Sequence, residues 1–370
     1  MAGSVTQGAL AATILFILLS LAISTDVPTP ANSADLDRWI SVNTMAFNAR
    51  RAEIASGIDT KLEPRLVVAE KKRQVITVSQ DGKGDFKTVT DAVNSVPAGN
   101  SHRTIIKIGP GIYKEKVLVD RSRPFITFYG ELNAMPTITF DGTAAKYGTI
   151  YSATVAVESH FFMAVNIIFQ NTAPEPAPGA QGGQAVAMRI SGDKAAFYNC
   201  KFYGYQDTLC DDIGRHFFQD CFIQGTVDFI FGNGRSIYKN CELHSVGKGA
   251  IAITAQARNS VADKSGFSFL HCKVTGSGNV YLSRAWKQSS RVVFAYSYLD
   301  SLVNPKGWDD KGYLDRHQTV FYGEYKCMGP GSSTSQRASY GKVLTDAQAK
   351  PFISMTFIRA ATWLLPHPTL

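Results

Sequence analysis

The sequence FYNCKF, which begins at Phe197, has four later counterparts in the chain. They are FQDCFI from Phe218, YKNCEL from Tyr238, FLHCKV from Phe269 and the more divergent FAYSYL from Phe294. Their fourth residues are Cys200, Cys221, Cys241, Cys272 and Ser297, at intervals of 21, 20, 31 and 25 residues. The segment FMAVNI from Phe162 is interpreted as a weaker, earlier copy. Variable spacing around one coil length is typical of a solenoid whose turns carry loops of different size.

Each copy has the residue types of a stacked strand, in which alternate side chains point inward. The cysteines are therefore predicted to form an interior ladder of small buried thiols. Disulfides between neighbouring coils stay open as an alternative, because equivalent positions lie about 4.8 Å apart.

Short β-rich runs also precede the repeat, separated by Gly, Asp, Asn and Pro: VITVS from Val75, RTIIKI from Arg103, FITFYG from Phe125 and TITF from Thr137. Helical periodicity is weak, apart from a short segment near 89–96. The sequence therefore predicts an all-β solenoid that forms a single domain over residues 74–370.

The composition favours an acidic partner. The formal net charge is +8 and the pI is about 9.1, which suits nucleic acid, anionic lipid or a polyuronic acid. The one dense basic cluster, Lys71 to Arg73, is shorter than the stripes typical of nucleic-acid binders, so we do not expect nucleic acid as the partner.

The N-terminal region reads as a leader. Ala9 to Ile23 is an apolar run that is short for a membrane span and fits a secretory signal, predicted over residues 1–24. No Lys or Arg precedes it, so an uncleaved anchor stays an alternative. Residues 25–73 are predicted to be a linker with a possible helix from Leu36 to Ile54. We expect a secreted, extracellular or cell-wall protein whose mature form has no membrane segment.

Two aspartates share one position in the repeat. Asp207 follows Cys200 by seven residues, and Asp228 follows Cys221 by seven. Stacked coils would place the two carboxylates roughly 5 Å apart, so one of them should hold its proton more tightly. Such a pair can divide the roles of nucleophile and general acid and base. The alternative is that both are turn residues that bind backbone N–H groups.

The chain resembles the plant-type pectin methylesterases, or pectinesterases, from Val75 to Trp363. The resemblance is carried by GIYKEKV from Gly111, QAVAMR from Gln184, YQDTL from Tyr205, GTVDFIFG from Gly225 and YLSRAW from Tyr281. It implies a right-handed parallel β-helix with no metal or organic cofactor. It also implies hydrolysis of the methyl esters of pectin to free carboxylates and methanol.

The resemblance also assigns roles to residues. It makes Asp228 the nucleophile and Asp207 the general acid and base. It makes Gln184 and Gln206 stabilisers of the oxyanion, and it makes Arg284 the group that holds Asp228. Aromatic side chains are expected to form a wall for the sugars: Trp286, Phe231 and Trp308. Methylesterified pectin is the implied partner, a proteinaceous pectinesterase inhibitor is a second one, and the protein is expected to be a monomer.

Several residues depart from the family pattern or are interpreted as structural. Ser283, Ala285 and Cys210 replace commoner family residues, and the stretch APEPAPGAQGG before Gln184 indicates an enlarged loop. The inhibitor-like pro-domain of many relatives has no room here. Tyr113, Glu115 and His216 are interpreted as structural or packing residues.

Two other functions stay open at this point. A pectin-cleaving β-helix enzyme would share the solenoid and a paired-carboxylate site. A catalytically weak or inactive pectin-binding wall protein would share the solenoid alone.

Overall fold

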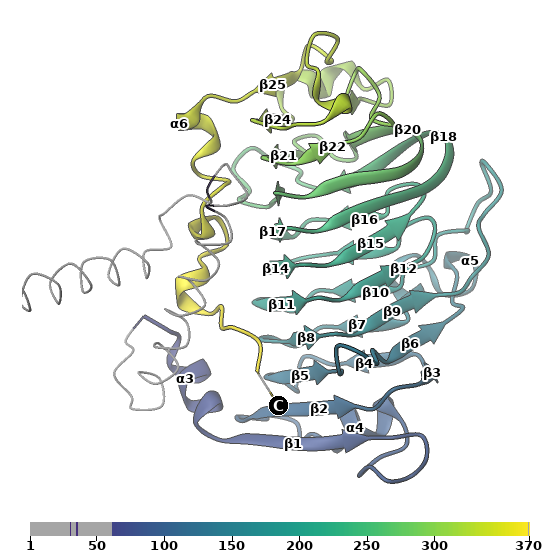
Figure 1. Cartoon of the computed structure of the whole chain (residues 1–370), viewed down its shortest axis with the longest axis vertical. Helices are drawn as coiled ribbons and strands as arrows, with labels where there is room; N and C mark the ends of the chain where they lie inside the picture. The colour runs from purple at the N-terminus through teal and green to yellow at the C-terminus, as the bar shows by residue number, and fades with distance from the viewer. Residues whose placement is uncertain (1–29, 31–34, 36–60, 369) are drawn as a thin grey trace, which may run out of the picture.

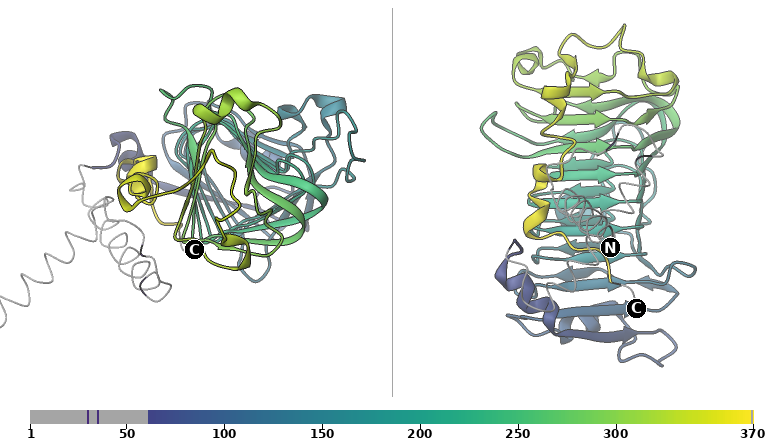
Figure 2. Two further views of the ribbon diagram at one scale, coloured as in Figure 1. Left: turned by 90° about the horizontal axis from the view of Figure 1, so that it is seen from above. Right: turned by 60° about the vertical axis from the view of Figure 1, so that its left-hand side comes forward.

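The computed structural model describes residues 30, 35, 61–368 and 370. The predicted leader and the predicted helix from Leu36 to Ile54 lie outside these residues. The described chain forms a right-handed parallel β-helix in which successive coils stack along the long axis (Figure 1). Seen down that axis, the coils superimpose around a common interior (Figure 2).

One sheet has eleven parallel strands, one from each coil. In spatial order they are β1 (Arg73–Val78), β2 (Arg103–Ile108), β5 (Ile126–Tyr129), β8 (Met163–Val165), β11 (Ala195–Tyr198), β14 (Arg215–Gln219), β17 (Arg235–Lys239), β19 (Gly266–Leu270), β21 (Arg291–Ala295), β24 (Phe321–Tyr325) and β25 (Gly341–Val343).

The second sheet has fourteen strands in two rows, which the long strands β18 (Glu242–Gln256) and β20 (Lys273–Arg284) join by running through both. One row contains β3 (Ile112–Lys114), β6 (Thr137–Phe140), β9 (Ile168–Asn171), β12 (Lys201–Tyr203), β15 (Phe222–Gly225) and β22 (Tyr298–Leu299). The other contains β4 (Val117–Val119), β7 (Val155–Val157), β10 (Met188–Ile190), β13 (Leu209–Asp211), β16 (Ile230–Gly232) and β23 (Trp308–Asp309). Each complete coil therefore contributes three strand runs.

Within residues 61–368 the helical segments are short and lie outside the coils. The α-helices are α3 (Pro64–Lys71), α4 (Val89–Ser95), α5 (Ala144–Tyr147) and α6 (Asp346–Ala349); the 3-10 turns are η1 (Ile150–Ser152), η2 (Leu314–Gln318), η3 (Pro330–Ser332), η4 (Met355–Ile358) and η5 (Ala360–Thr362). The predicted helix near 89–96 is α4. Among the residues that the structure describes, no helix has the length and apolar character needed to cross a lipid bilayer.

The five-copy repeat is confirmed as the register of the coils. Its aromatic residues Phe197, Phe218, Tyr238, Phe269 and Phe294 pair on consecutive strands. They stack inside the solenoid with ring centroids 4.5 to 4.7 Å apart. Offset stacking of buried rings contributes roughly 0.5–1.5 kcal/mol per pair beyond area burial, so this ladder reinforces the coil register.

The predicted cysteine ladder is also confirmed. All six cysteines are free, and the four in the repeat are fully buried. Each repeat thiol contacts a backbone carbonyl, as the Cys272 Sγ does at the Tyr238 oxygen (3.4 Å). The Ser297 hydroxyl, on the next coil, donates to the Phe269 oxygen in the same way (3.3 Å).

The earlier copy FMAVNI was aligned wrongly. Tyr198 pairs with Val165, so the residue opposite Cys200 is Ile167 and not Val165. The true counterpart of FYNCKF is the segment beginning at Ala164. An alanine in place of the first aromatic residue hid this register.

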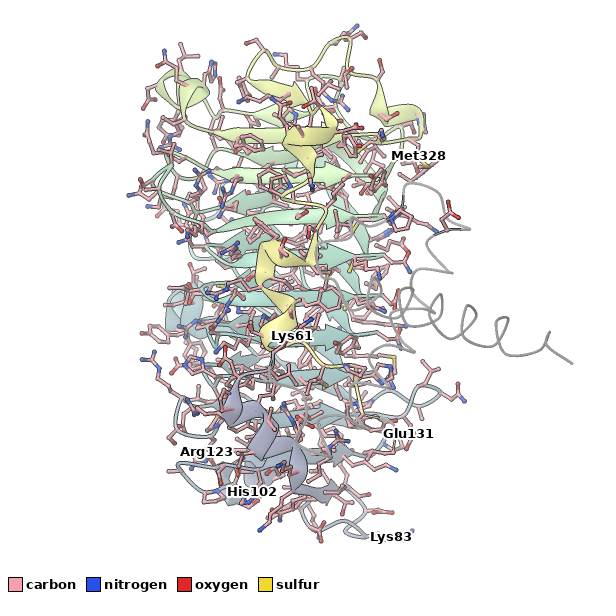
Figure 3. All side chains as sticks on the ribbon, turned by 90° about the vertical axis from the view of Figure 1, so that its left-hand side faces the viewer. Lys61, Lys83, His102, Arg123, Glu131 and Met328 are labelled. Atoms are coloured by element: carbon pink, nitrogen blue, oxygen red, sulfur yellow. The ribbon has the colours of Figure 1, made fainter. Side chains whose placement is uncertain are left out.

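The first coils and the outer face of the eleven-stranded sheet are covered by other parts of the chain. Glu115 fixes α4 over the first coils, because its carboxylate accepts from the backbone N–H groups of Val89 (2.9 Å) and Thr90 (2.8 Å). Tyr113 is buried and donates to the Gly109 oxygen (2.9 Å), so both residues have the structural roles predicted for them. The C-terminal segment after α6 runs back along the outer face of the eleven-stranded sheet (Figures 1 and 3).

Candidate active site

Asp207 and Asp228 lie side by side on adjacent coils, each two residues before a strand of the β10–β13–β16 row. The register pairs Leu209 with Ile230, which places Asp207 opposite Asp228 as predicted. Their backbone N–H groups bond to the next coil, at the Val227 oxygen (3.1 Å) and the Ala252 oxygen (2.8 Å).

Both aspartates have a left-handed backbone, with φ of 65° at Asp207 and 51° at Asp228. Aspartate tolerates this conformation better than most residues, although it still costs energy. The strand alternation therefore breaks at the same point on both coils, and the two side chains leave the backbone in equivalent positions.

Arg284 binds one of the two carboxylates. Its Nε donates to both oxygens of Asp228 (2.7 and 2.8 Å), and a terminal nitrogen lies 2.7 Å from Oδ2. Asp228 is 5% exposed and the Arg284 side chain 21%. Charge-assisted pairs of this kind are strong and hold both groups in place, so Asp228 is a fixed, charge-compensated carboxylate.

The Asp207 carboxyl has a different environment. It is buried and makes no hydrogen bond to another described residue. Burial raises its pKa well above the usual value, and the charge of Asp228 raises it further, while Arg284 opposes both effects. The geometry therefore distinguishes an unpaired carboxyl with a raised pKa from a carboxyl paired with an arginine.

The side chains of Gln184 and Gln206 remain available for a ligand. Both residues are half-buried, and neither side-chain amide is bonded to another described residue. The Ala185 N–H donates to the backbone carbonyl of Gln206 (3.1 Å), so the two glutamines lie on neighbouring coils, with Gln206 next to Asp207 in the sequence. Both side-chain amides are thus unpaired among the described residues.

Phe231 and Trp286 contact each other near the aspartates, but Phe231 is buried (4% exposed), so of these two rings only Trp286 is partly open to a sugar. Their rings meet edge to face with centroids 6.0 Å apart. Phe231 is part of a small apolar cluster with Cys210, Ala156 and other residues, against which the half-buried Trp286 packs. Cys210 is thus a buried thiol within this cluster, and burial raises its pKa well above the usual value.

Trp308 does not belong to an exposed wall, contrary to the prediction. It is 1% exposed and stacks on Tyr322 with centroids 4.7 Å apart. It begins β23 and faces the interior of the solenoid, where no sugar can reach it. Ser283 and Ala285 are also buried, so these two departures from the family pattern alter packing beneath the site.

The sequence did not reveal an acidic partner for His216, but the structure contains one. The His216 Nδ1 lies 2.5 Å from an Asp211 oxygen, its Nε2 lies 3.0 Å from the Gly192 oxygen, and Tyr238 donates to Asp211 (2.7 Å). His216 and Asp211 are both 0% exposed. This network is therefore structural, in agreement with the packing role predicted for His216.

The fold and the site together define a β-helical protein that presents two adjacent carboxyls, one of them paired with an arginine, on one face of the solenoid. The chain belongs to the pectinesterase family, whose model, described as "Pectinesterase", matches residues 75–361. It is accordingly a carboxylic ester hydrolase of that family.

Individual relatives agree with this assignment. The chain is 59% identical to "Putative pectinesterase 63" of Arabidopsis thaliana over 79% of this chain and 87% of that protein. It is 47% identical to "Probable pectinesterase 49" of the same plant over 97% and 98% of the two chains. Among solved structures, the pectin methylesterase from carrot matches with a TM-score of 0.70 and 34% identity, covering 79% of this chain and 97% of that one. A pectin methylesterase solved in complex with a hexasaccharide matches with a TM-score of 0.67, 28% identity, and coverage of 79% and 98%.

Proposed function

We propose that this protein removes methyl groups from pectin through Asp228 as nucleophile and Asp207 as general acid and base. The observation that carries the proposal is the unlike environment of the two in-register carboxyls. Asp228 is paired with Arg284, and Asp207 is buried with a raised pKa. Methylesterified homogalacturonan is proposed as the substrate because pectin methylesterases are among the similar solved structures.

The first half of the reaction forms an acyl-enzyme. An Asp228 oxygen attacks the ester carbonyl carbon, and the electron pair of the C=O bond moves onto its oxygen. The amides of Gln184 and Gln206 donate to that oxyanion. When the carbonyl re-forms, the bond to the methoxy group breaks, and the Asp207 proton passes to the leaving oxygen to give methanol.

The second half restores the enzyme. Asp207, now ionised, takes a proton from water while the water oxygen attacks the acyl carbon. Collapse of this intermediate breaks the bond to Asp228 and leaves a free carboxyl on the sugar. Arg284 stabilises the Asp228 carboxylate as it leaves, as it does at the start.

Methanol release and polymer length, measured together on highly methylated pectin, test this proposal. Asp228→Asn and Asp207→Asn should each lower the rate of methanol release by about 10³-fold or more, since each removes a group that acts in both halves. Asp220→Asn is a matched control, because Asp220 also has a left-handed backbone (φ 55°) but sits at another corner of the coil, where its Oδ1 accepts from Asn240 (2.6 Å).

The outcomes separate the candidate functions. Methanol release with constant polymer length supports the esterase, whereas shortening of the polymer supports a pectin-cleaving enzyme. Binding without either product supports an inactive wall protein. If Asp228→Asn releases methanol as fast as Asp220→Asn does, Asp228 is not the nucleophile. Secretion to the cell wall and action as a monomer are proposed alongside this activity.

A further inference from the structure

The eleven-stranded sheet carries a row of cations where its strands begin. Lys194 precedes β11, and Arg215, Arg235 and Arg291 open β14, β17 and β21. The register places Arg215 beside Arg235, and Arg235 beside Gly266, the residue that opens β19. Along this edge the cations therefore occupy all but one of five successive coils. In Figure 3 this is the side of His102 and Arg123, where the strands of the sheet start.

The lower part of this row is neutralised by acids. The Lys194 Nζ lies 2.6 Å from Glu63, and the Arg215 guanidinium binds both oxygens of Asp193 (2.9 and 2.5 Å). Ion pairs within the fold therefore neutralise both of these cations.

The upper part has no such compensation. Among the described residues, neither Arg235 nor Arg291 has a carboxylate within ion-pair distance. The Arg291 Nε donates to a neutral carbonyl, that of Ser265 (2.8 Å), and the Arg235 Nε is buried without a hydrogen-bond partner. Asp263 bonds to Asn233 and to the Ser265 N–H instead.

Two further arginines lie near this group. Arg258 donates to the carbonyls of Ser260 (3.0 Å) and Val261 (2.8 Å), and Arg359 projects from the C-terminal segment as an exposed residue. Arg258 is buried (4% exposed), so we name only Arg235, Arg291 and Arg359 the arginine strip. Burial, followed by the charges of Arg258 and Arg235, lowers the pKa of Arg291 to about 10 although Asp263 opposes the shift, so these guanidinium groups repel one another.

The fold holds the strip in place despite this repulsion. Arg235 lies over the Phe357 ring (5.2 Å) and Arg291 over the Phe352 ring (5.7 Å). At Gly266 an added Cβ would come 2.8 Å from the Arg291 Nε, so the lack of a side chain there lets Arg291 lie across the gap in the row. Cation–π contacts orient guanidinium groups without neutralising them, which leaves their charge for a ligand.

The number of cations favours a polymer over a small anion. Arg235 and Arg291 begin strands two coils apart, but both guanidinium groups lie over the Phe357 ring, 5.2 and 5.8 Å from its centroid. Arg359 adds a third charge, since burial lowers the pKa of Arg235 and neighbouring charges, that of Arg359 among them, lower it further. A chain with repeated carboxylates can pair with several of these cations at once, whereas one carboxylate cannot neutralise them all. Arg235 and Arg291 lie on the eleven-stranded sheet and Arg359 on the C-terminal segment that packs against it, while Asp207 and Asp228 precede strands of the other sheet, so the two sites are distinct.

We propose that the arginine strip is a second, non-catalytic binding site for de-esterified pectin, whose successive carboxylates pair with its guanidinium groups. The inference rests on the proposed function, because this polymer would be the product of the reaction. A product-binding site away from the reacting carboxyls would keep the enzyme on pectin that it has already modified.

Binding of methyl-free polygalacturonate to the Asp228→Ala protein tests the proposal without turnover. Adding Arg235→Gln and Arg359→Gln should weaken binding at least about fivefold at low salt, because two exposed or half-exposed ion pairs are lost. The matched control adds Lys83→Gln and Lys114→Gln, which remove the same net charge from exposed positions in the first coils. Arg359→Glu alone changes one exposed residue and should weaken binding even if Arg235→Gln disturbs folding.

Three results would overturn the inference. The strip variants could bind as tightly as their parent, or the lysine control could lose as much affinity as they do. Polyglutamate of matched charge could bind the strip more tightly than polygalacturonate does, which would make an acidic protein the better ligand. Failure of the proposed function is seen separately, as an absence of methanol release by the protein with Asp228 intact.

Discussion

Replacing Arg284 by glutamine should impair catalysis more than it impairs folding. The wild-type guanidinium makes three contacts of 2.7 to 2.8 Å with Asp228, which is 5% exposed. Two unit charges about 4 Å apart attract by roughly 4 kcal/mol at an effective dielectric constant near 20. Breaking a buried pair costs about 3–5 kcal/mol.

Breaking the Arg284–Asp228 pair should cost less free energy than this, because water can reach part of the Arg284 side chain. The Arg284 side chain is 21% exposed, so we expect about 2–3 kcal/mol. If that energy supports the Asp228 carboxylate in the transition state, kcat/KM should fall roughly 30- to 150-fold. Arg284→Lys keeps the charge but not the planar guanidinium group, so kcat/KM should fall less than it does in Arg284→Gln.

The assay is initial-rate methanol release at several pectin concentrations, with unfolding followed by circular dichroism. Arg337→Gln is the control, because Arg337 forms a comparably buried pair with Glu324 (2.7 Å) away from the aspartates. It should lower Tm and leave kcat/KM of the folded protein unchanged. A folded Arg284→Gln protein with more than about a third of wild-type kcat/KM would refute the role assigned to the pair.

Three further predictions concern the fold and its pH dependence. Because the pKa of Asp207 is raised in the folded state, the folded protein holds a proton that the unfolded chain has released. The free energy of unfolding should therefore fall as the pH rises from about 4 through the folded-state pKa. Asp207→Asn should remove this fall, as measured by urea titrations at a series of pH values. Phe218→Ala should cost about 3–5 kcal/mol in urea unfolding, since this ring is fully buried between two stacked neighbours; a loss below about 1 kcal/mol would contradict the ladder. Cys221→Ser should cost less than about 1.5 kcal/mol, because Ser297 already occupies an equivalent position, and a thiol reagent should label the buried cysteines only after unfolding.

The sequence predicted those parts of the fold in which each coil repeats a residue type. The aromatic and cysteine positions recur, so the register from Phe197 to Phe294 and the pairing of Asp207 with Asp228 could be deduced by counting. Counting failed where a coil changed residue type. On an earlier coil, Ala164 occupies the position of the first aromatic residue. On a later coil, Glu324 pairs with Phe294 and occupies that position, so Cys327 was not recognised as a further member of the cysteine ladder.

Features that depend on contacts between side chains of different strands could not be predicted in this way. Trp308 looked like a sugar-binding aromatic residue, but its burial depends on Tyr322, which belongs to another strand. The partner of His216 is Asp211, on the other side of a turn. Neither contact follows from residue type or spacing.

The left-handed backbone at Asp207 and Asp228 bears on how such a sequence can evolve. Asparagine or glycine adopts this conformation with equal or less strain, and replacing Asp207 by either also removes a carboxyl that is costly to bury. Substitutions that abolish activity at Asp207 are therefore expected to make the chain more stable. A descendant that loses the chemistry can keep its folded solenoid and its charged surface, and selection can then act on what remains.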